Sequence, residues 1–260
     1  MMTQNKIQNV IITGASSGIG ESLAKHYAKS GAQLGLIARC MDLLQRLQTE
    51  IVATGAPKPF VYDLDVRNAS ALKLAANDFL AHVGAPDIVI ANAGVSRGTL
   101  TGIEDDLTAF QDVFDINVMG TVNTFHAFLG VMQNAKSGTL VGIASVAGFR
   151  GIPGSSAYSA SKAAAIKYCE SLRVELRGSG VSVVTICPGY IRTPMTAVNT
   201  FKMPFLIEAD DAAARFARAI AAKTSFTVIP WNMGIAARIL RVVPNWLYDR
   251  VFSHMPRKPR

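Results

Sequence analysis

Short apolar runs alternate with longer amphipathic stretches along most of this 260-residue chain. The runs have the β-branched and apolar composition of buried strands, and they lie at 10–12, 33–38, 60–64, 88–91, 139–143, 181–186 and 226–229. Between them, a helical spacing of apolar positions predicts helices over about 18–30, 43–51, 109–133 and 156–177. This alternation predicts an α/β fold in which about seven parallel strands form a doubly wound sheet with helices on both faces.

The alternation continues without an internal repeat, a low-complexity segment or a linker, which predicts one domain over residues 1–230. Residues 231–260 form an extension that is too short to be an independent domain. Within the domain, residues 194–207 are less regular and contain the apolar segment 201–206. Two interpretations of this segment stay open: a mobile cover over a site, or an ordinary helix that packs on the core.

The composition agrees with a globular protein, since half of the residues are apolar and 17% are charged. No run of about 18 uninterrupted apolar residues appears, so no membrane-spanning helix is predicted. The polar start of the chain lacks the features of a secretory signal. Cys40, Cys169, Cys187 and the four histidines show no metal-ligand spacing, so we expect reduced thiols, a cytoplasmic location and no metal site.

The formal net charge of +8 is concentrated at the carboxyl end of the chain. Residues 231–260 contain six basic side chains and one acidic side chain, which together account for +5 of the +8. The first 230 residues are therefore only mildly basic, and no nucleic-acid partner is predicted. The same extension is rich in apolar residues, Trp231 and Trp246 among them. Three roles stay open for it: packing on the domain as a cap over a lipophilic pocket, joining subunits, or peripheral contact with an anionic membrane surface.

A glycine-rich turn joins the first predicted strand to the first predicted helix. Its sequence from Thr13 to Gly20 has the spacing G-x-x-x-G-x-G, which differs from the common G-x-G-x-x-G dinucleotide fingerprint. Glycine allows a tight turn and close approach to a pyrophosphate, whose charge suits the free N–H groups at a helix start. Because ligands of doubly wound sheets bind at the carboxyl ends of the strands, this turn is a candidate nucleotide site.

Tyr158 and Lys162 are four residues apart in a predicted helix and therefore lie on the same face. A phenol has an ordinary pKa of about 10, and a cation beside it stabilises the phenolate and lowers that pKa. The pair is thus a candidate proton-transfer device. Ser145 precedes Tyr158 by 13 residues and lies at the end of an apolar run.

Six short elements resemble, in order, the short-chain dehydrogenase/reductase family over about residues 6–230. They are the turn from Thr13 to Gly20, Asn92-Ala93-Gly94, Asn117, Ser145, Tyr158 with Lys162, and Pro188-Gly189. The resemblance implies a Rossmann-type catalytic domain over residues 1–230, a nicotinamide cofactor, and interconversion of a carbonyl and an alcohol by hydride transfer. It also implies a homodimer or homotetramer, in which the helices carrying Asn117 and Tyr158 pack across a two-fold axis.

The resemblance assigns roles to four catalytic residues. Tyr158 is expected to be the general acid for carbonyl reduction and the general base for alcohol oxidation. Lys162 is expected to lower the pKa of that phenol and to bind the nicotinamide ribose, while Ser145 hydrogen-bonds the substrate oxygen. Asn117 is expected to help hold a water that links Lys162 to solvent.

The expected cofactor contacts follow the carboxyl ends of successive strands. They are Gly14, Ser16, Ser17, Gly18, Ile19, Gly20, Arg39, Asp65, Val66, Asn92, Ala93, Gly94, Tyr158, Lys162, Pro188, Gly189, Ile191 and Thr193. The last four belong to the loop that the family closes over the nicotinamide, and Asp65 matches the position that contacts the adenine amino group.

The end of the second predicted strand indicates which nicotinamide cofactor is used. An acidic residue there would hold the ribose hydroxyls of NAD, but this chain has Arg39. A permanently charged guanidinium suits a 2′-phosphate, so NADP(H) is favoured over NAD(H). The alternative is that Arg39 stacks on the adenine or faces solvent.

The sequence thus predicts an NADP(H)-dependent carbonyl reductase or alcohol dehydrogenase that acts on a small molecule, with reduction as the cellular direction. The apolar extension is expected to favour lipophilic substrates such as lipid-like ketones. A catalytically silent NADP(H)-binding sensor is the alternative, and the four catalytic residues argue against it because a sensor has no need of them. A sugar-nucleotide epimerase or dehydratase is a third interpretation, and it is disfavoured because the chain is too short for the larger substrate-binding domain of such enzymes.

Overall fold

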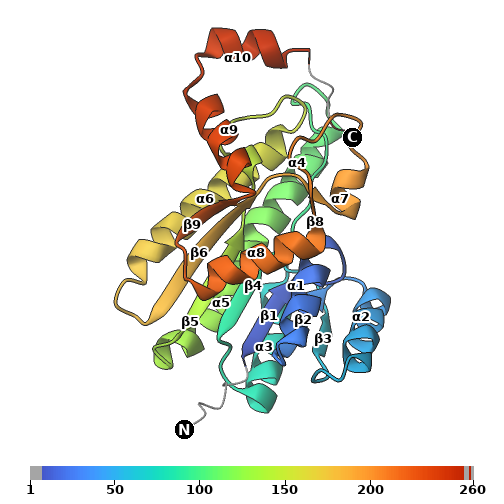
Figure 1. The fold of residues 1–260 in the computed structure, drawn as a ribbon, viewed down its shortest axis with the longest axis vertical. Coiled ribbons are helices and arrows are strands. Elements are labelled where there is room, and N and C mark those ends of the chain that lie inside the picture. The colour runs from blue at the N-terminus through green and yellow to red at the C-terminus, as the bar shows by residue number, and fades with distance from the viewer. Residues whose placement is uncertain (1–7, 255–257, 259–260) are drawn as a thin grey trace.

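Seven parallel strands form one sheet in the computed structural model, which describes residues 8–254 and residue 258. The sheet order is β3-β2-β1-β4-β5-β6-β9 (Figure 1). The strands are β1 (Asn9–Thr13), β2 (Gln33–Ala38), β3 (Phe60–Asp63), β4 (Ile88–Ala91), β5 (Gly138–Ile143), β6 (Val181–Pro188) and β9 (Phe226–Ile229). The winding direction of the chain reverses between β1 and β4, which creates a crevice at the carboxyl ends of these strands. The predicted parallel sheet of about seven strands is confirmed.

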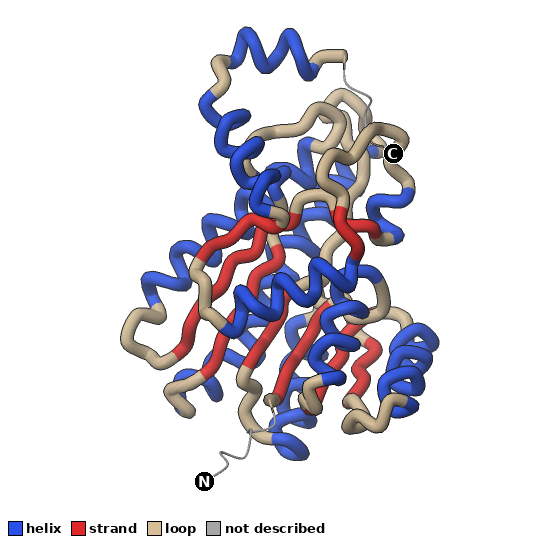
Figure 2. The backbone as a smooth tube through the Cα atoms, viewed as in Figure 1, coloured by secondary structure: helices blue, strands red, loops and turns tan. Residues whose placement is uncertain are grey.

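The strands send alternate side chains to two separate apolar cores. In β1, Val10 and Ile12 face one core, and Ile11 faces the other. Helices α1 (Gly18–Lys29), α2 (Met41–Ala53) and α8 (Ala209–Ala221) pack on the first face, while α3 (Ala69–Val83), α5 (Gly120–Asn134) and α6 (Ser156–Glu175) pack on the second (Figure 2). Because both faces are buried, the strands are apolar along nearly their whole length.

The long helix predicted over 109–133 differs from the observed structure in the middle. The helical stretch runs through α4 (Asp106–Phe114) and α5, but one π-helical turn, η1 (Asp115–Met119), interrupts it. Asn117 lies in this turn, where its side chain hydrogen-bonds both backbone groups of Val95. The wider turn is a local departure of the type that often marks a functional position, and residue periodicity does not reveal it.

The chain after β6 builds one end of the molecule. Two short paired strands, β7 (Ile191–Arg192) and β8 (Ile207–Glu208), enclose the irregular segment with the short helix α7 (Pro194–Ala197). After β9, helices α9 (Trp231–Val242) and α10 (Asn245–Phe252) extend beyond the sheet at the top of Figure 1. Over the part of the chain that the structure describes, no helix has the length and apolar character needed to cross a membrane. The polar start of the chain and two tail cations, Arg257 and Arg260, lie outside the described residues.

Candidate active site

A cavity of about 270 Å³ lies in the crevice at the carboxyl ends of the strands. All of the expected cofactor contacts line it except Gly20. Ser145 lines the cavity as well, whereas Asn117 does not. The sequence reasoning missed several lining residues, because apolar or backbone contacts have no motif: Leu64, Val95, Ile116, Ile143 and Thr196.

The glycine-rich turn has the conformation that its sequence predicts. Gly14 and Gly18 have φ angles of 65° and 57°, in the left-handed region that favours glycine. Gly20 does not line the cavity, but a Cβ added there would overlap the carbonyl oxygen of Gly14. Ser17 precedes α1 without forming a side-chain cap. The turn therefore leaves the first N–H groups of α1 available to an anion in the cavity.

Asn92 braces this turn from the end of β4. Its Nδ2 donates to the carbonyl oxygens of Thr13 and Gly14 at 3.0 and 3.2 Å. In return, Thr13 Oγ1 accepts hydrogen bonds from the backbone N–H groups of Asn92 and Ala93. The predicted role of Asn92 in lining the cleft thus includes a contact that fixes the shape of the turn.

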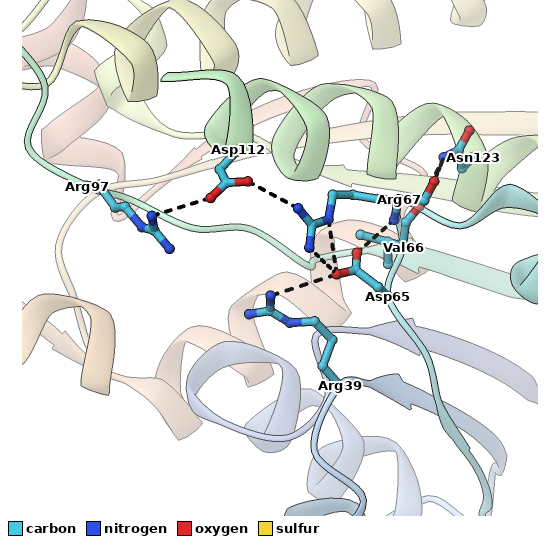
Figure 3. Close-up of polar contacts among 7 residues, drawn as sticks. All are labelled: Arg39, Asp65, Val66, Arg67, Arg97, Asp112 and Asn123. Carbon is cyan, nitrogen blue, oxygen red and sulfur yellow. Dashed lines mark hydrogen bonds and ion pairs between the residues drawn. The ribbon is translucent and has the colours of Figure 1, made fainter. Parts of the chain in front are cut away.

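Arg39 lies beside a network of charged residues at one end of the cavity (Figure 3). Asp65 accepts two hydrogen bonds from the Arg67 guanidinium at 2.8 and 3.1 Å, and Arg67 also pairs with Asp112. These contacts, led by the Arg67 side chain, hold the pKa of the Asp65 carboxyl below its ordinary value. Arg39 Nη1 lies 3.8 Å from Asp65, and its side chain is 59% exposed. Arg67 is therefore occupied, while Arg39 keeps donors for another anion.

The loop that carries Asp65 is held from the neighbouring helix. Asn123 of α5 donates through Nδ2 to the carbonyl oxygen of Val66 at 3.0 Å (Figure 3). This anchor fixes Val66, which is 6% exposed and lines the cavity. Asp65 lines the cavity, and its carboxylate is paired with the Arg67 guanidinium.

Three of the four expected catalytic residues converge on one side of the cavity. Tyr158 and Lys162 lie on the same face of α6, and Ser145 follows β5. Ser145 and Tyr158 share a side-chain hydrogen bond, and Ser145 Oγ also accepts one from the N–H of Ala147 at 3.1 Å. Lys162 Nζ donates to the carbonyl oxygen of Ile143 at 2.8 Å. This arrangement places a phenol, a hydroxyl and an ammonium around one space.

Burial shifts the pKa of both titratable groups on α6. The pKa of Tyr158 is raised because burial disfavours the phenolate, and the hydrogen bond to Ser145 acts in the opposite direction. Burial also lowers the pKa of Lys162 to about 8. Lys162 Nζ lies 5.9 Å from the centroid of the Tyr158 ring. The phenol is therefore held in its protonated form.

Asn117 stands behind this group. Its Oδ1 accepts from the N–H of Val95 at 2.8 Å, and its Nδ2 donates to the carbonyl oxygen of Val95 and to Ser161 Oγ, both at 3.0 Å. Asn117 is 1% exposed. In the structure it ties the π-helical turn to the strand β4 loop and to α6.

A second cavity, of about 210 Å³, adjoins the first. Tyr158, Ser145 and Gly189 line both cavities. The second cavity is bounded mainly by apolar side chains from the loop after β5, from the irregular segment and from the extension. Tyr158 and Ser145 therefore stand at the junction of the first cavity and a more apolar pocket.

The irregular segment and the extension both cover the second cavity. Asn199 and Phe201 line it from the segment, and Met233 and Leu240 line it from α9. The opposite face of the extension is exposed and apolar, with Trp231, Ile235, Ile239, Val242, Trp246 and Val251 outward. The inner face of the extension thus lines the second cavity, as a cap over a pocket would.

No group of three or more His, Cys, Asp or Glu side chains that could hold a metal ion is found among residues 8–254 and 258. The three cysteines are free; Cys169 and Cys187 are buried near Lys162, and Cys40 is exposed.

Comparisons with known proteins find a family model and a relative that match most of this chain. A family model described as short chain dehydrogenase matches residues 8–203. An uncharacterized oxidoreductase of Myxococcus xanthus (strain DK1622) is 39% identical over 249 residues, which cover 95% of this chain and 97% of the relative.

Two solved structures have the same fold. An alcohol dehydrogenase of the archaeon Thermococcus sibiricus, complexed with 5-hydroxy-NADP, is 26% identical with a TM-score of 0.75, covering 86% of this chain and 96% of its own. A short chain dehydrogenase/reductase of Burkholderia phymatum in complex with NAD is 24% identical with a TM-score of 0.83, covering 98% of each chain, and this likeness shows the fold alone.

Proposed function

The chain belongs to the short-chain dehydrogenase family, and we propose that within this family it is an NADP(H)-dependent carbonyl reductase with Tyr158 as its general acid. Its class is that of NAD(P)-dependent oxidoreductases acting on CH–OH and C=O groups. One observation carries the proposal: Tyr158 and Ser145 line both the first cavity and the more apolar second cavity. The relatives give no sign of the silent sensor that was the alternative.

The residues of the first cavity fit a nicotinamide dinucleotide. The Gly14 to Gly20 turn offers N–H groups to a pyrophosphate, and Arg39 offers a cation to the adenosine end. At the other end, a Cβ on Gly94 would lie 3.1 Å from Asn117 Oδ1 and 3.4 Å from Lys162 Nζ, so glycine keeps this wall of the cavity open. When bound, the nicotinamide supplies or accepts a hydride.

The protein side of the reaction is placement and proton transfer. Ser145 holds the substrate oxygen beside Tyr158, and the protonated phenol donates to that oxygen as it gains negative charge. Lys162 supplies a positive charge on the same side of the site. In the reverse direction, the phenolate form would accept the proton from an alcohol. Asn117 holds the backbone of the Val95 loop, and it remains the proposed neighbour of a water that replenishes the proton.

NADP(H) is the proposed cofactor because of the charge around Arg39. Arg39 rather than an acid follows β2 directly, Asp42 lies inside α2, and Asp65 is already paired with Arg67. A 2′-phosphate would meet the exposed guanidinium of Arg39 rather than a free negative charge.

The extension and the oligomer belong to the same proposal. The inner face of α9 gives the second cavity an apolar wall, which suits a lipophilic carbonyl substrate. The exposed outer face, with Arg238, Arg241 and Arg250, suits peripheral contact with an anionic membrane. A homodimer or homotetramer through the helices that carry Asn117 and Tyr158 is consistent with exposed apolar side chains there, Met119 in η1 and Val174 in α6.

A turnover screen with matched NADPH and NADH, over ketones and aldehydes of graded size, tests the proposal. We expect faster turnover with NADPH, and Arg39→Asp should lower the NADPH-to-NADH ratio of kcat/KM by about 10- to 100-fold through loss of a charged contact. Tyr158→Phe should lower kcat by about 100-fold or more while NADPH binding persists. A wild-type preference for NADH, or full activity of Tyr158→Phe, would contradict the proposal.

Two further measurements serve as controls. Arg46→Asp places the same charge change on an exposed arginine of α2 that pairs with Glu50 and lines neither cavity, so the cofactor ratio should not move. NADPH fluorescence titration of Tyr158→Phe separates loss of chemistry from loss of binding.

A further inference from the structure

Lys258, near the end of the extension, reaches back to the catalytic tyrosine. Its Nζ lies 5.9 Å from the centroid of the Tyr158 ring, the same distance as Lys162 Nζ. It donates a hydrogen bond to Ser96 Oγ at 2.7 Å, and it lines the second cavity. Two ammonium groups thus stand near one phenol, and only Lys162 has a role in the reaction described above.

The second cavity carries positive charge without a balancing carboxylate. Its lining includes two cations, Arg150 and Lys258, and no Asp or Glu among the described residues. Arg150 is already committed, since it donates to the carbonyl oxygens of Leu240 and Val243 and to Asn245 Oδ1. Lys258 is therefore the cation of this cavity that keeps capacity for a ligand.

No carboxylate of the described residues lies opposite Lys258. Among the described residues it forms no ion pair, and burial alone lowers its pKa. An ammonium has three donors, and the Ser96 hydroxyl accepts from one of them. A partly buried cation without a counter-ion is unfavourable, and an anionic ligand would remove that penalty.

The other residues that line the second cavity indicate the chemistry of the rest of the ligand. Side chains from three different segments contribute an apolar surface: Val146, Phe149, Ile152, Met233, Leu240 and Phe252. A molecule that fills this space therefore has an apolar body. Because Lys258 and Tyr158 are close together, the anionic group of that molecule lies only a few bonds from the carbonyl that meets the phenol.

We propose that Lys258 is a substrate-recognition residue that binds a carboxylate, so that the substrate is an apolar oxo acid whose carboxylate lies near its carbonyl. This inference rests on the proposed carbonyl reductase activity and adds the substrate class. Reduction then proceeds as above: the carbonyl carbon gains a hydride, the oxygen gains the Tyr158 proton, and the carboxylate stays unchanged on Lys258.

The test compares 4-oxodecanoate with its uncharged methyl ester, using NADPH as reductant. We expect wild-type protein to favour the acid in kcat/KM, and Lys258→Met to lower the acid-to-ester ratio by about 10- to 100-fold. Lys258→Arg should keep most of the preference because it keeps the charge. Lys73→Met, on an exposed lysine of α3 outside both cavities, should leave the ratio unchanged.

A ratio that Lys258→Met leaves unaltered, whether both rates fall together or neither falls, overturns the proposal. Binding gives a second measurement that does not depend on turnover. Calorimetric titration of the NADP⁺-loaded protein should show octanoate binding about 10-fold or more tighter than octanamide, with the difference lost in Lys258→Met. Octanoate selectivity without turnover of any carbonyl would refute the proposed reductase and leave the anion site standing, whereas turnover without octanoate selectivity would refute the anion site alone.

Discussion

Lys162 combines a position at the proposed reaction centre with burial of a charged group. It is 5% exposed, and its ammonium donates to a neutral backbone acceptor, the carbonyl oxygen of Ile143. Burial therefore lowers its pKa from 10.5 to about 8. An unfavourable buried charge of this kind is typical of functional residues and agrees with the role proposed for Lys162.

The free energy of unfolding should depend on pH, because the buried charge of Lys162 destabilises the folded chain. Below about pH 8, Lys162 is protonated in both the folded and the unfolded chain, so the penalty is fully present. As pH rises from 8 toward 10.5, the folded chain loses the proton first and the penalty disappears. Relative to Lys162→Met, wild-type protein should gain about 2 kcal/mol of unfolding free energy between pH 7.5 and 10.

Urea denaturation of both proteins at the two pH values measures this difference. Groups common to both proteins cancel in the comparison. A difference in unfolding free energy that stays constant with pH would show that the buried ammonium is not destabilising.

At the scale of elements, one arginine fastens the extension to the domain. Arg150, in the loop after β5, hydrogen-bonds the carboxyl end of α9 through the carbonyl oxygens of Leu240 and Val243. Its guanidinium carbon lies 3.9 Å from the centroid of the Tyr248 ring in α10, and Tyr248 in turn donates to the carbonyl oxygen of Gly151. Because the last carbonyls of a helix have no partner within the helix, these contacts also cap α9.

Removal of this contact should open the apolar pocket. In Arg150→Met, the carbonyls of α9 lose their donors, so α9 and α10 separate more often from the loop after β5. We expect KM for long-chain ketones to rise about tenfold, with a smaller change for the shortest ketones, because each charged hydrogen bond contributes about 1.5–3 kcal/mol. Faster limited proteolysis between α9 and α10 should accompany the change in KM.

Arg173→Met is the matched control, since Arg173 is exposed on α6 and lines neither cavity. Equal KM changes for short and long ketones in Arg150→Met would show that Arg150 does not act through the pocket wall.

At the scale of the molecule, the extension gives the protein two different ends. The sheet and its helices fill most of the volume, while α9 and α10 stand apart at the top of Figure 1. The outward side of these helices exposes 71% of Trp231, 79% of Val242 and 70% of Trp246. Arginines lie between the apolar residues, and a second copy on a two-fold axis would bring like charges together, whereas anionic lipid would balance them.

Vesicle binding tests this end of the molecule. Wild-type protein should sediment with phosphatidylglycerol vesicles and much less with phosphatidylcholine vesicles. Trp246→Ser should lower the bound fraction at least about tenfold, since an indole contributes about 2 kcal/mol when buried. Leu74→Ser, at an equally exposed apolar position on α3, should bind as wild type does. Equal binding to both lipids, or no effect of Trp246→Ser, would contradict peripheral contact with anionic membranes.

Local sequence patterns were enough to predict the parallel sheet and the edge at which the proposed site residues gather. Alternation of apolar runs with helical spacing is a local property, so it predicts the seven strands of the sheet and the helical stretches of α1, α2, α4 with α5, and α6. It does not predict the short strands β7 and β8 or the helices α3, α7 and α8. Parallel strands end at one edge of the sheet, so motif residues at those ends, such as Gly14 and Gly94, necessarily gather. The Tyr158–Lys162 spacing fixes a shared helix face in the same local way.

Contacts between distant segments became visible only once the elements were packed together. Arg150 and the carbonyl of Val243 are 93 residues apart, and Ser96 and Lys258 are 162 residues apart. The π-helical turn at Asn117 and the pairing of Asp65 with Arg67 rather than with a free ligand were also beyond the sequence. Such contacts depend on how whole elements are oriented when their apolar faces pack, and no residue spacing records that orientation. The local pattern therefore set the chemistry of the site, and the packing of the extension set the shape and charge of its pocket.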